Sequence, residues 1–286
     1  MSGAVAVRRF VHGDLAALAR FCDAARALDP CVEPFGHRLG AIAAGSRAAL
    51  ELWRVAEGED GALYGVAFAA FRESAAVAGH DFYAAVHPSL RRQGLGRALS
   101  DPALSSGGSL RARVRDDAKA GRAFAASLGF VETGAELSLQ WDREPIEAPA
   151  VPALRIRRAA PRDQRVLQEL SNDAWAGAPD PIASRADEIA QLFTEQDRAI
   201  LVAESAGIPA GYLSALALGR TVAIEEIAVR PGLRRRGIAR ALLAHALADA
   251  QGAVLWVSES NSPGRALYRA LGFRRTARRL VLELRR

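Results

Sequence analysis

The sequence has few of the residues from which disulfide-rich, metal-binding or membrane-spanning proteins are built. Its 286 residues include only two cysteines, Cys22 and Cys31, which are too few for a disulfide framework. No further Cys or His cluster accompanies them to complete a zinc site, so we expect no metal. No apolar run approaches the ~18 residues of a membrane span, and residues 1–10 carry no charged and then apolar leader. We therefore expect a soluble, cytoplasmic protein without membrane contact.

Lysine and aromatic residues are also scarce. Lys119 is the only lysine, and aromatic residues make up 6% of the chain, so nearly all the basic charge is arginine. A net charge of +6 and a pI of about 10.1 suit an anionic ligand or a nucleic acid without selecting either. The arginines at 274, 275, 278 and 279 have few aromatic neighbours and no recognition motif. We therefore expect a solvated strand face there and no nucleic-acid partner.

The sequence does contain an internal repeat. Residues of identical type recur at a constant offset of 143 positions, and chance rarely keeps one offset over seven pairs. The pairs are Val86 and Val229, Pro88 and Pro231, Arg91 and Arg234, Gly94 and Gly237, Leu99 and Leu242, Gly129 and Gly272, and Phe130 and Phe273. We therefore predict two domains of similar fold.

A proline-containing stretch separates the two copies. Residues 144–153 hold three prolines, which favour a semi-rigid linker: Pro145, Pro149 and Pro152. We predict an N-terminal domain over 1–143, this linker over 144–153, and a C-terminal domain over 154–286.

The C-terminal copy has the clearer pattern of elements. Stretches that read as strands alternate with apolar residues at helical spacing, which is typical of a mixed α/β domain. We expect strands over 154–159, 199–204, 210–217, 222–229, 253–257 and 276–284, and helices near 162–172, 184–196, 238–247 and 263–271. In the N-terminal copy we expect the helix after residue 94 to be interrupted by Asp101 and Pro102 and then by residues 105–108, where a proline and glycines would break regular structure.

A glycine-containing loop, VRPGLRRRGIAR at 229–240, joins a strand to a helix. The first turn of a helix leaves about four backbone N–H groups unpaired and carries about half a positive charge, so a diphosphate can bind there. Gly237 and the small Ala239 let phosphates approach the backbone, and neighbouring arginines add charge-assisted contacts. The loop lacks the GK[ST] ending of a Walker loop and the third glycine of a Rossmann fingerprint.

A second block, NSPGRALYRALGF at 261–273, follows a strand and starts a helix. Together the two blocks closely resemble the GNAT superfamily of acyl-CoA-dependent N-acyltransferases. The family's loop, Q/R-x-x-G-x-G/A, is matched by Arg234, Gly237 and Ala239. Its later block is matched by Asn261, Ala266, Leu267, Tyr268, Gly272 and Phe273, and the turn GIPAGY at 207–212 is also typical.

The resemblance covers the C-terminal half and implies both a fold and a ligand. The implied fold is α/β, with two tandem GNAT-like domains, each a mixed, mostly antiparallel central sheet flanked by helices. The implied donor is acetyl-CoA. Its implied contacts are Ile227, Ala228, Val229, Arg234, Arg235, Arg236, Gly237, Ile238, Ala239, Arg240 and Asn261.

Acetyl transfer from a thioester to an amine needs a base for the amine, a stabilised oxyanion and a proton for the departing thiolate. By resemblance, Tyr268 would protonate the sulfur and an N–H near 227–229 would polarise the carbonyl. The family often takes its base from the strand before the loop, which here carries Glu225 and Glu226. Since consecutive strand residues point to opposite faces, only one of them faces the substrate. We favour Glu226, because in a regular strand it would lie on the same face as Ile224, which looks less exposed to solvent.

The N-terminal copy keeps Arg91, Gly94 and Gly96 and can still bind a phosphate, but it lacks the remaining residues. At the 143 offset, Ala125 stands in place of Tyr268, Ala118 in place of Asn261, and Phe82 and Tyr83 in place of Glu225 and Glu226. We predict a structural or substrate-shaping copy. In the C-terminal copy, the family contacts its acceptors where Trp175 lies, so Trp175 is a candidate acceptor-binding residue.

The leading hypothesis is an N-acetyltransferase that uses a ternary complex and direct attack by a small-molecule or peptide amine. The tandem form also resembles the mycothiol synthases, which implies a cysteinyl amine as an alternative acceptor. A different class of protein stays open, namely a non-catalytic acyl-CoA-binding or regulatory protein. For assembly we expect a monomer, with the two domains as a pseudo-dimer, or a weak homodimer.

Overall fold

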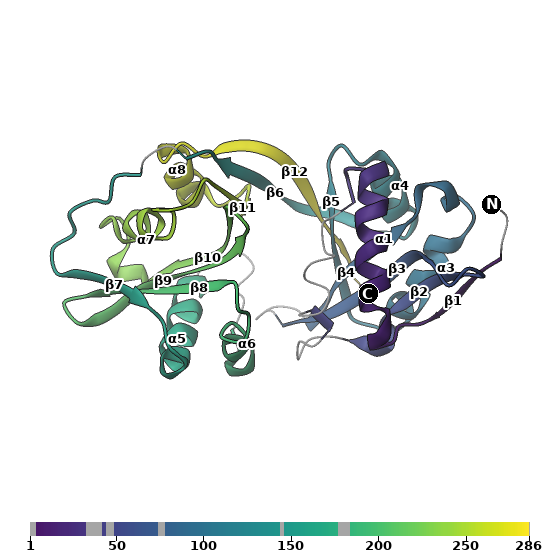
Figure 1. The fold of residues 1–286 in the computed structure, drawn as a ribbon, viewed down its shortest axis with the longest axis horizontal. Coiled ribbons are helices and arrows are strands. Elements are labelled where there is room, and N and C mark those ends of the chain that lie inside the picture. Colours follow the sequence, from purple (N-terminus) through teal and green to yellow (C-terminus); the bar gives the residue numbers. More distant parts are fainter. Residues whose placement is uncertain are drawn as a thin grey trace. The chain divides into compact units, whose positions relative to one another are not determined.

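The chain folds into two compact units in the computed structural model, which describes residues 4–32, 42–43, 49–73, 78–143, 146–176 and 184–285. The first unit comprises Met1–Glu73, Val77–Thr133 and Leu280–Arg286, and the second is mainly Gly134–Arg279. Each is a mixed, mostly antiparallel sheet flanked by helices, which confirms the predicted fold class (Figure 1). Glu144 and Pro145 of the predicted linker lie outside the described residues.

The sheet of the first unit has the order β1-β2-β3-β4-β5, followed by the end of β12. From β1 to β4 neighbouring strands are antiparallel, whereas β4 and β5 are parallel and joined through a helix. The elements are β1 (Val5–Arg9), α1 (Leu15–Leu28), β2 (Arg54–Gly58), β3 (Leu63–Glu73), β4 (Ala78–Val86), α3 (Leu95–Ser105), β5 (Ser109–Arg115), α4 (Lys119–Ser127) and β12 (Arg274–Leu284).

The expected interruption of the helix at Asp101 and Pro102 is wrong, whereas the helix does end within the expected residues 105–108. α3 runs without a break from Leu95 to Ser105 and contains Pro102. A proline removes one backbone donor and crowds the carbonyl four residues earlier. Pro102 lies only three residues before the end of the helix, where few further turns depend on it, and the helix stops before Gly107, whose φ is 77°.

The second unit repeats this plan with the order β6-β11-β10-β9-β8-β7, and the start of β12 lies beside β6. Only β10 and β11 are parallel among the described pairs of this order. The elements are β6 (Val131–Trp141), β7 (Leu154–Arg158), α5 (Gln164–Trp175), α6 (Ala186–Gln191), β8 (Arg198–Ser205), β9 (Ile208–Leu218), β10 (Thr221–Val229), α7 (Ile238–Ala246), β11 (Gly252–Ser258) and α8 (Ser262–Ala270). Among the described helices, none is long and apolar enough to span a membrane.

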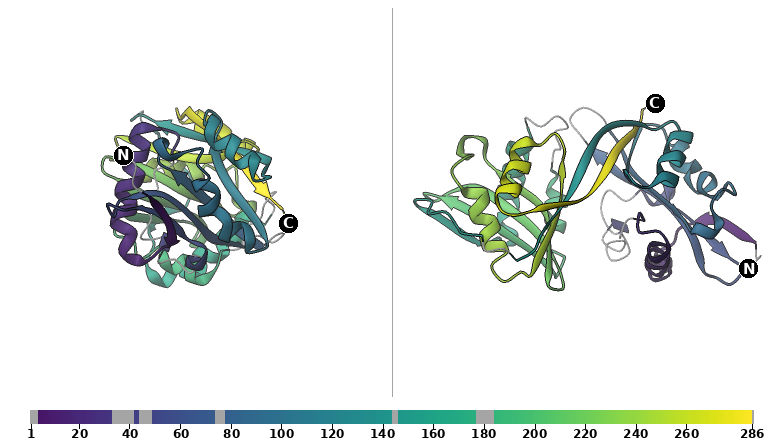
Figure 2. Two further views of the ribbon diagram at one scale, coloured as in Figure 1. Left: turned by 90° about the vertical axis from the view of Figure 1, so that its right-hand side faces the viewer. Right: turned by 90° about the horizontal axis from the view of Figure 1, so that it is seen from above.

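The last strand of each repeat completes the sheet of the other unit. β6 and β12 correspond at the 143 offset, yet β6 pairs with β11, from Ala253 opposite Trp141 to Ser258 opposite Glu136. The end of β12 lies next to β5 and places Leu280 and Leu282 in the core of the first unit. Figure 2 shows β6 beside β12 in the right-hand view. The compact units are therefore discontinuous in sequence, whereas the predicted ranges 1–143 and 154–286 are continuous.

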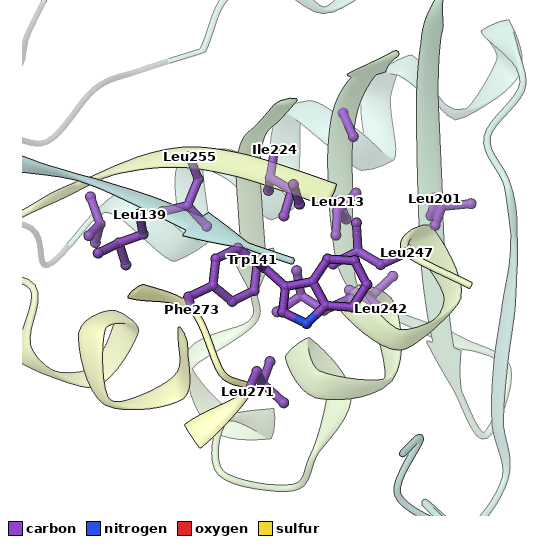
Figure 3. Packing of buried hydrophobic residues seen from close by; sticks show 14 of the residues in the cluster. Leu139, Trp141, Leu201, Leu213, Ile224, Leu242, Leu247, Leu255, Leu271 and Phe273 are labelled. Carbon is purple, nitrogen blue, oxygen red and sulfur yellow. The ribbon is translucent and has the colours of Figure 1, made fainter. Parts of the chain in front are cut away.

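Apolar side chains from β6 form part of the core of the second unit. Trp141 is 3% exposed and its ring lies 6.4 Å from that of Phe273, near Leu242 and Leu247 of the α7 region (Figure 3). This cluster covers the face of the sheet against which α7 packs. A smaller cluster with Leu167, Leu170 and Tyr212 covers the face against which α5 packs. The sheet is thus held between α5 on one face and α7 on the other.

His80 on β4 predicts a pH dependence of stability in the first unit. The imidazole is buried against Phe71, and neither ring nitrogen has a hydrogen-bond partner among the described residues. Burial lowers the pKa of His80 below its ordinary 6.5. Below about pH 6.5 the unfolded chain therefore takes up this proton more readily than the folded one, and stability falls by up to about 1.4 kcal/mol per pH unit until the folded pKa is reached.

We expect His80→Leu to remove this contribution. The difference in unfolding free energy between the variant and the wild type should be constant above about pH 7.5 and should shift in favour of the variant as the pH falls below about 6.5. Urea unfolding across this range measures it. A difference that does not change with pH would contradict a buried neutral His80.

Candidate functional site

β10 and β11 run together for only part of their length. Their ladder begins at Thr221 opposite Gly252 and ends at Ile224 opposite Leu255. β10 continues to Val229 and stays paired with β9, while β11 continues to Ser258. Beyond Ile224 the edge of β10 toward β11 therefore has main-chain groups outside the described ladder, with which an extended ligand can pair. The predicted contacts Ile227, Ala228 and Val229 lie in this stretch.

The loop after β10 turns main-chain amides toward one side. A 3-10 turn over Pro231–Leu233 leads to Arg235 and Gly237, whose φ angles are 63° and 83°. Left-handed residues next to right-handed ones gather successive N–H groups into an anion-binding concavity, here at the first turn of α7. None of the amides from Arg235 to Arg240 donates to a main-chain carbonyl of the described residues. The stretch predicted to form a cradle thus combines left-handed residues with amides that make no main-chain hydrogen bond to a described residue.

Two of the predicted cofactor arginines use their side chains within the protein. Arg234 donates through Nε to the carbonyl of Val229 at 3.1 Å and through a terminal nitrogen to the carbonyl of Ala174 at 2.8 Å. Arg240 donates to the carbonyl of Glu147 at 3.0 Å. Arg234 thus ties the end of α5 to the loop, while Arg235 and Arg236 are exposed. Recognition of an anion by this loop would rest mainly on its amides.

The stretch after residue 145 packs against the same loop. A Cβ added at Gly237 would lie 2.9 Å from Cγ of Pro149 and 3.3 Å from Val151. We expect Gly237→Ala to lower stability by more than about 1 kcal/mol, because alanine is strained at positive φ and because it would displace Pro149. Thermal unfolding should show a loss of at least about 2–4 °C.

The matched control is Gly232→Ala in the same loop. Gly232 has an ordinary φ, and an added Cβ would meet nothing within 4 Å. The control should therefore change stability by less than about 0.5 kcal/mol. Equal losses in the two variants would contradict this account of Gly237.

α8 carries Tyr268 and is preceded by Asn261. The side-chain oxygen of Asn261 accepts the N–H of Gly264 at 2.9 Å, so this predicted cofactor residue acts as the N-cap of α8 in the structure. Tyr268 is half-buried and packs at 5.5 Å from the ring of Phe273. Its hydroxyl makes no hydrogen bond to a described residue, and burial raises the pKa of Tyr268 to about 12. The phenol therefore keeps its proton at neutral pH.

Glu225 and Glu226 lie at a β-bulge, which overturns the expectation that they point to opposite faces. The ladder with β9 shifts register between Ile224 and Glu226, so Glu225 is an extra residue. Glu226 stands opposite Ser214. Glu225 pairs with Arg198, which itself donates to the Ser214 hydroxyl at 2.8 Å.

Because directly opposed residues share a face, both carboxylates lie on the face that carries α5. The reason given for favouring Glu226 was therefore wrong as well. Ile224 packs in the cluster on the α7 face, and the bulge ends its alternation with Glu226.

The partners of the two carboxylates differ. Glu225 is neutralised by Arg198, whose side chain is 2% exposed and which also pairs with Glu195. Glu226 has no cationic partner among the described residues. Its Oε1 accepts from the Trp175 indole N–H at 2.8 Å and from the Ser171 hydroxyl at 3.0 Å. The structure thus brings the two predicted residues Trp175 and Glu226 together.

Ser171 and Tyr212 were not identified from the sequence. Both are buried, and Tyr212 on β9 is close enough to Glu226 for the carboxylate charge to raise the pKa of Tyr212, in addition to the larger effect of desolvation. A signal for Ser171 was available, because it is a polar residue on the apolar face of α5 that Leu167 and Leu170 define. Tyr212 gave none beyond its place in the turn motif.

The first unit retains the opening but not the bulge. β4 and β5 also part after Phe82 opposite Ala112, and Arg92 and Gly94 repeat the left-handed φ angles, at 66° and 80°. In the described ladder between β3 and β4 the register is continuous, so Phe82 and Tyr83 pack in different clusters. A cavity of about 470 Å³ lies at this opening, lined by residues of β4, β5, α4 and the loop that contains Gly94.

Comparison with known proteins shows which family part of the chain resembles. Residues 165–273 match the model of the Acetyltransferase (GNAT) family. A mycothiol acetyltransferase of Clavibacter michiganensis subsp. michiganensis is 36% identical over 146 residues, which are 49% of this chain and 46% of that protein. The chain therefore spans about half the length of this curated relative.

Solved structures match over nearly the whole chain. A tandem GNAT protein from the clavulanic acid biosynthesis pathway has a TM-score of 0.73 at 20% identity and covers 99% of this chain and 98% of its own. A GCN5-related N-acetyltransferase from Sphaerobacter thermophilus has a TM-score of 0.72 at 21% identity, with coverage of 98% and 95%. The parted strands, the amide loop and the repeated unit agree with these matches: the second copy resembles the GNAT acetyltransferase family over residues 165–273, and the whole chain has the fold of tandem GNAT proteins.

Proposed function

We propose that the second unit transfers an acetyl group from acetyl-CoA to a primary amine by direct attack in a ternary complex. The observation that carries this proposal is the parting of β10 and β11 beside the amide loop, with Glu226 at the bulge in the parted stretch. An extended thioester donor can pair with the open edge of β10 while its diphosphate meets the amides from Arg235 to Arg240.

Acetyl-CoA supplies the activated acyl group, and the second unit has a candidate residue for the base and one for the acid. Glu226 has no cationic partner among the described residues, so its carboxylate can accept a proton from the amine. Tyr268 is protonated at neutral pH because its pKa is about 12, and it can donate that proton to a thiolate. Glu225 is engaged by Arg198 and is the weaker candidate for the base.

The bulge also supports a role for the main chain. The side chain of Glu225 is 22% exposed, yet the residue as a whole is exposed, so much of its exposed surface is main chain. Main-chain N–H groups in this part of β10 can stabilise negative charge on a carbonyl oxygen. The predicted group near Ile227, Ala228 and Val229 lies within the same parted stretch.

The side chains around Glu226 indicate a class of acceptor. A carboxylate and an indole at one place, Glu226 and Trp175, suit an ammonium group attached to an apolar or ring-containing body. The similarity to a mycothiol acetyltransferase supports a cysteinyl amine as an alternative acceptor. Other small-molecule and peptide amines are the main candidates.

A second function, non-catalytic binding of an acyl-CoA, is favoured for the first unit by its cavity of about 470 Å³ beside the second amide loop. Ala125 and Tyr83 stand where the second unit has Tyr268 and Glu226, so no proton transfer of this kind is available there. Calorimetry with acetyl-CoA should then give two binding events per chain. Ala120→Glu, an exposed position lining the cavity, should remove one event by charge repulsion and leave turnover unchanged.

A turnover screen with acetyl-CoA tests the main proposal. The panel should contain aliphatic amines, aminoglycosides, peptides with free N-termini and cysteinyl amines. Release of free thiol reports turnover, and the mass of the acetylated product replaces it for acceptors that carry their own thiol. Uptake of acetyl-CoA with product formation is expected. Absence of acetyl-CoA binding by calorimetry would overturn the proposal.

A further inference from the structure

Glu226 is held from one side by α5. Two donors from this helix, the Trp175 indole N–H and the Ser171 hydroxyl, point to the same carboxylate oxygen, Oε1. No described residue donates to Oε2. Hydrogen bonds to a charged carboxylate are stronger than those between neutral groups, so two of them set its orientation. One oxygen is fixed by the protein and the other is left for a ligand.

The Ser171 hydroxyl is itself held in place. It lies 2.7 Å from the hydroxyl of Ser184, whose N–H donates to the side chain of Asn172 at 2.8 Å. The carbonyl of Ser184 accepts from the Gln168 side chain at 2.9 Å. With the Ser184 hydroxyl donating to Ser171, the Ser171 proton is directed at Glu226. These contacts hold the Ser171 hydroxyl in the orientation in which it donates to Glu226.

Tyr212 approaches the same carboxylate from the sheet. Its side chain is fully buried, and its hydroxyl completes no hydrogen bond of good geometry with a described residue. The Glu226 carboxylate and the Ser171 hydroxyl lie near it, since both influence the pKa of Tyr212. A buried hydroxyl without a partner is costly, so a small rotation that lets it donate to Glu226 is favourable. Tyr212 is thus poised as a third donor.

We propose that Ser171, Trp175 and Tyr212 form a clamp of positioning residues that presents Oε2 of Glu226 to the acceptor amine. This inference rests on the proposed function, since it assigns the supports of the base in that reaction. The clamp is a property of the second unit. The first unit has no carboxylate there, because the regular β4 strand carries Tyr83 at the position that matches Glu226.

A mutant cycle tests the clamp. Trp175→Phe, Ser171→Ala and Tyr212→Phe are each combined with Glu226→Gln, and kcat and KM are measured with acetyl-CoA and the fastest amine of the panel. Each single clamp variant should lower kcat about 10-fold, with the KM for acetyl-CoA unchanged. In the Glu226→Gln background the same substitutions should have almost no effect, because they act only through that carboxylate. Tyr64→Phe, which lies in the first unit and outside the site, is the matched control.

NMR spectroscopy tests the clamp without any acceptor. In protein labelled with ¹⁵N-tryptophan, the indole N–H resonance of Trp175, assigned from Trp175→Phe, should move upfield in Glu226→Gln as its charged partner is lost. Tyr212→Phe should shift this resonance in the wild-type background only. Equal losses of kcat in both backgrounds, or a resonance that ignores Glu226, would overturn the clamp. If Glu226→Gln keeps the wild-type kcat while the resonance responds, the assignment of the base fails and the clamp geometry stands.

Discussion

Replacing Tyr268 by phenylalanine is expected to lower kcat for acetyl transfer at least about 10²-fold, while acetyl-CoA binds as it does to the wild type. The substitution removes one hydroxyl that makes no hydrogen bond to a described residue, and the ring keeps its contact with Phe273. A general acid is needed only when the thiolate departs, so the loss falls on turnover and not on donor binding. Steady-state kinetics and calorimetry with acetyl-CoA measure the two quantities.

Tyr64→Phe provides the matched control for this prediction. It removes a phenol that donates to Asp60 at 2.8 Å on the surface of the first unit, and it should leave kcat unchanged. The pKa of Tyr268 gives a further check. Because this pKa is about 12, loss of the phenol proton should not limit the wild-type rate between pH 6 and 9. Undiminished turnover in Tyr268→Phe would show that another group, or water, protonates the sulfur.

The second large effect is expected from Glu226→Gln, which should lower kcat about 10²-fold or more because an amide cannot accept the amine proton. The substitution keeps the size of the side chain and an oxygen that can accept from Ser171 and Trp175. Folding and donor binding should therefore be retained. Steady-state kinetics at saturating acetyl-CoA measures the loss.

Glu225→Gln is the neighbouring comparison and should behave in the opposite way. Its carboxylate pairs with the buried Arg198, so the variant should lose about 2–4 °C in thermal stability with little change in kcat. Arg198 keeps Glu195 and Ser214 as partners, which limits the loss. A large fall in kcat for Glu225→Gln and none for Glu226→Gln would reverse the assignment of the base.

Local features of the site could be predicted because they depend on short stretches of chain. Gly237 takes a positive φ that other residues adopt at a cost, and a helix that starts directly after it presents free amides wherever the rest of the chain lies. Tyr268 comes seven residues after the capping Asn261, on a helix whose start the sequence already indicated. The repeat at an offset of 143 likewise predicts the same loop conformation in both copies, as Arg92 and Arg235 show.

Features that depend on pairing between distant residues could not be predicted in this way. The bulge at Glu225 is a mismatch of register between β10 and β9, and sequence alternation alone placed the two glutamates on opposite faces. The contact of Glu226 with Ser171 joins residues 55 positions apart, and that with Trp175 joins residues 51 positions apart. The cost of Pro102 depends on how much helix follows it, and in the structure only three residues of α3 do.

The sequence by itself determined that the chain repeats one α/β unit, where each glycine-containing loop lies, and which copy has Glu225, Glu226 and Tyr268. Tertiary structure alone decided that β6 completes the second sheet while β12 reaches the first, and that Glu226 rather than Glu225 is free of an arginine. The physical reason is that β6 and β12 share one apolar alternation, with Leu137 and Leu139 matched by Leu280 and Leu282. On local sequence alone, either strand could pair with either sheet. Only long-range packing selects the partner.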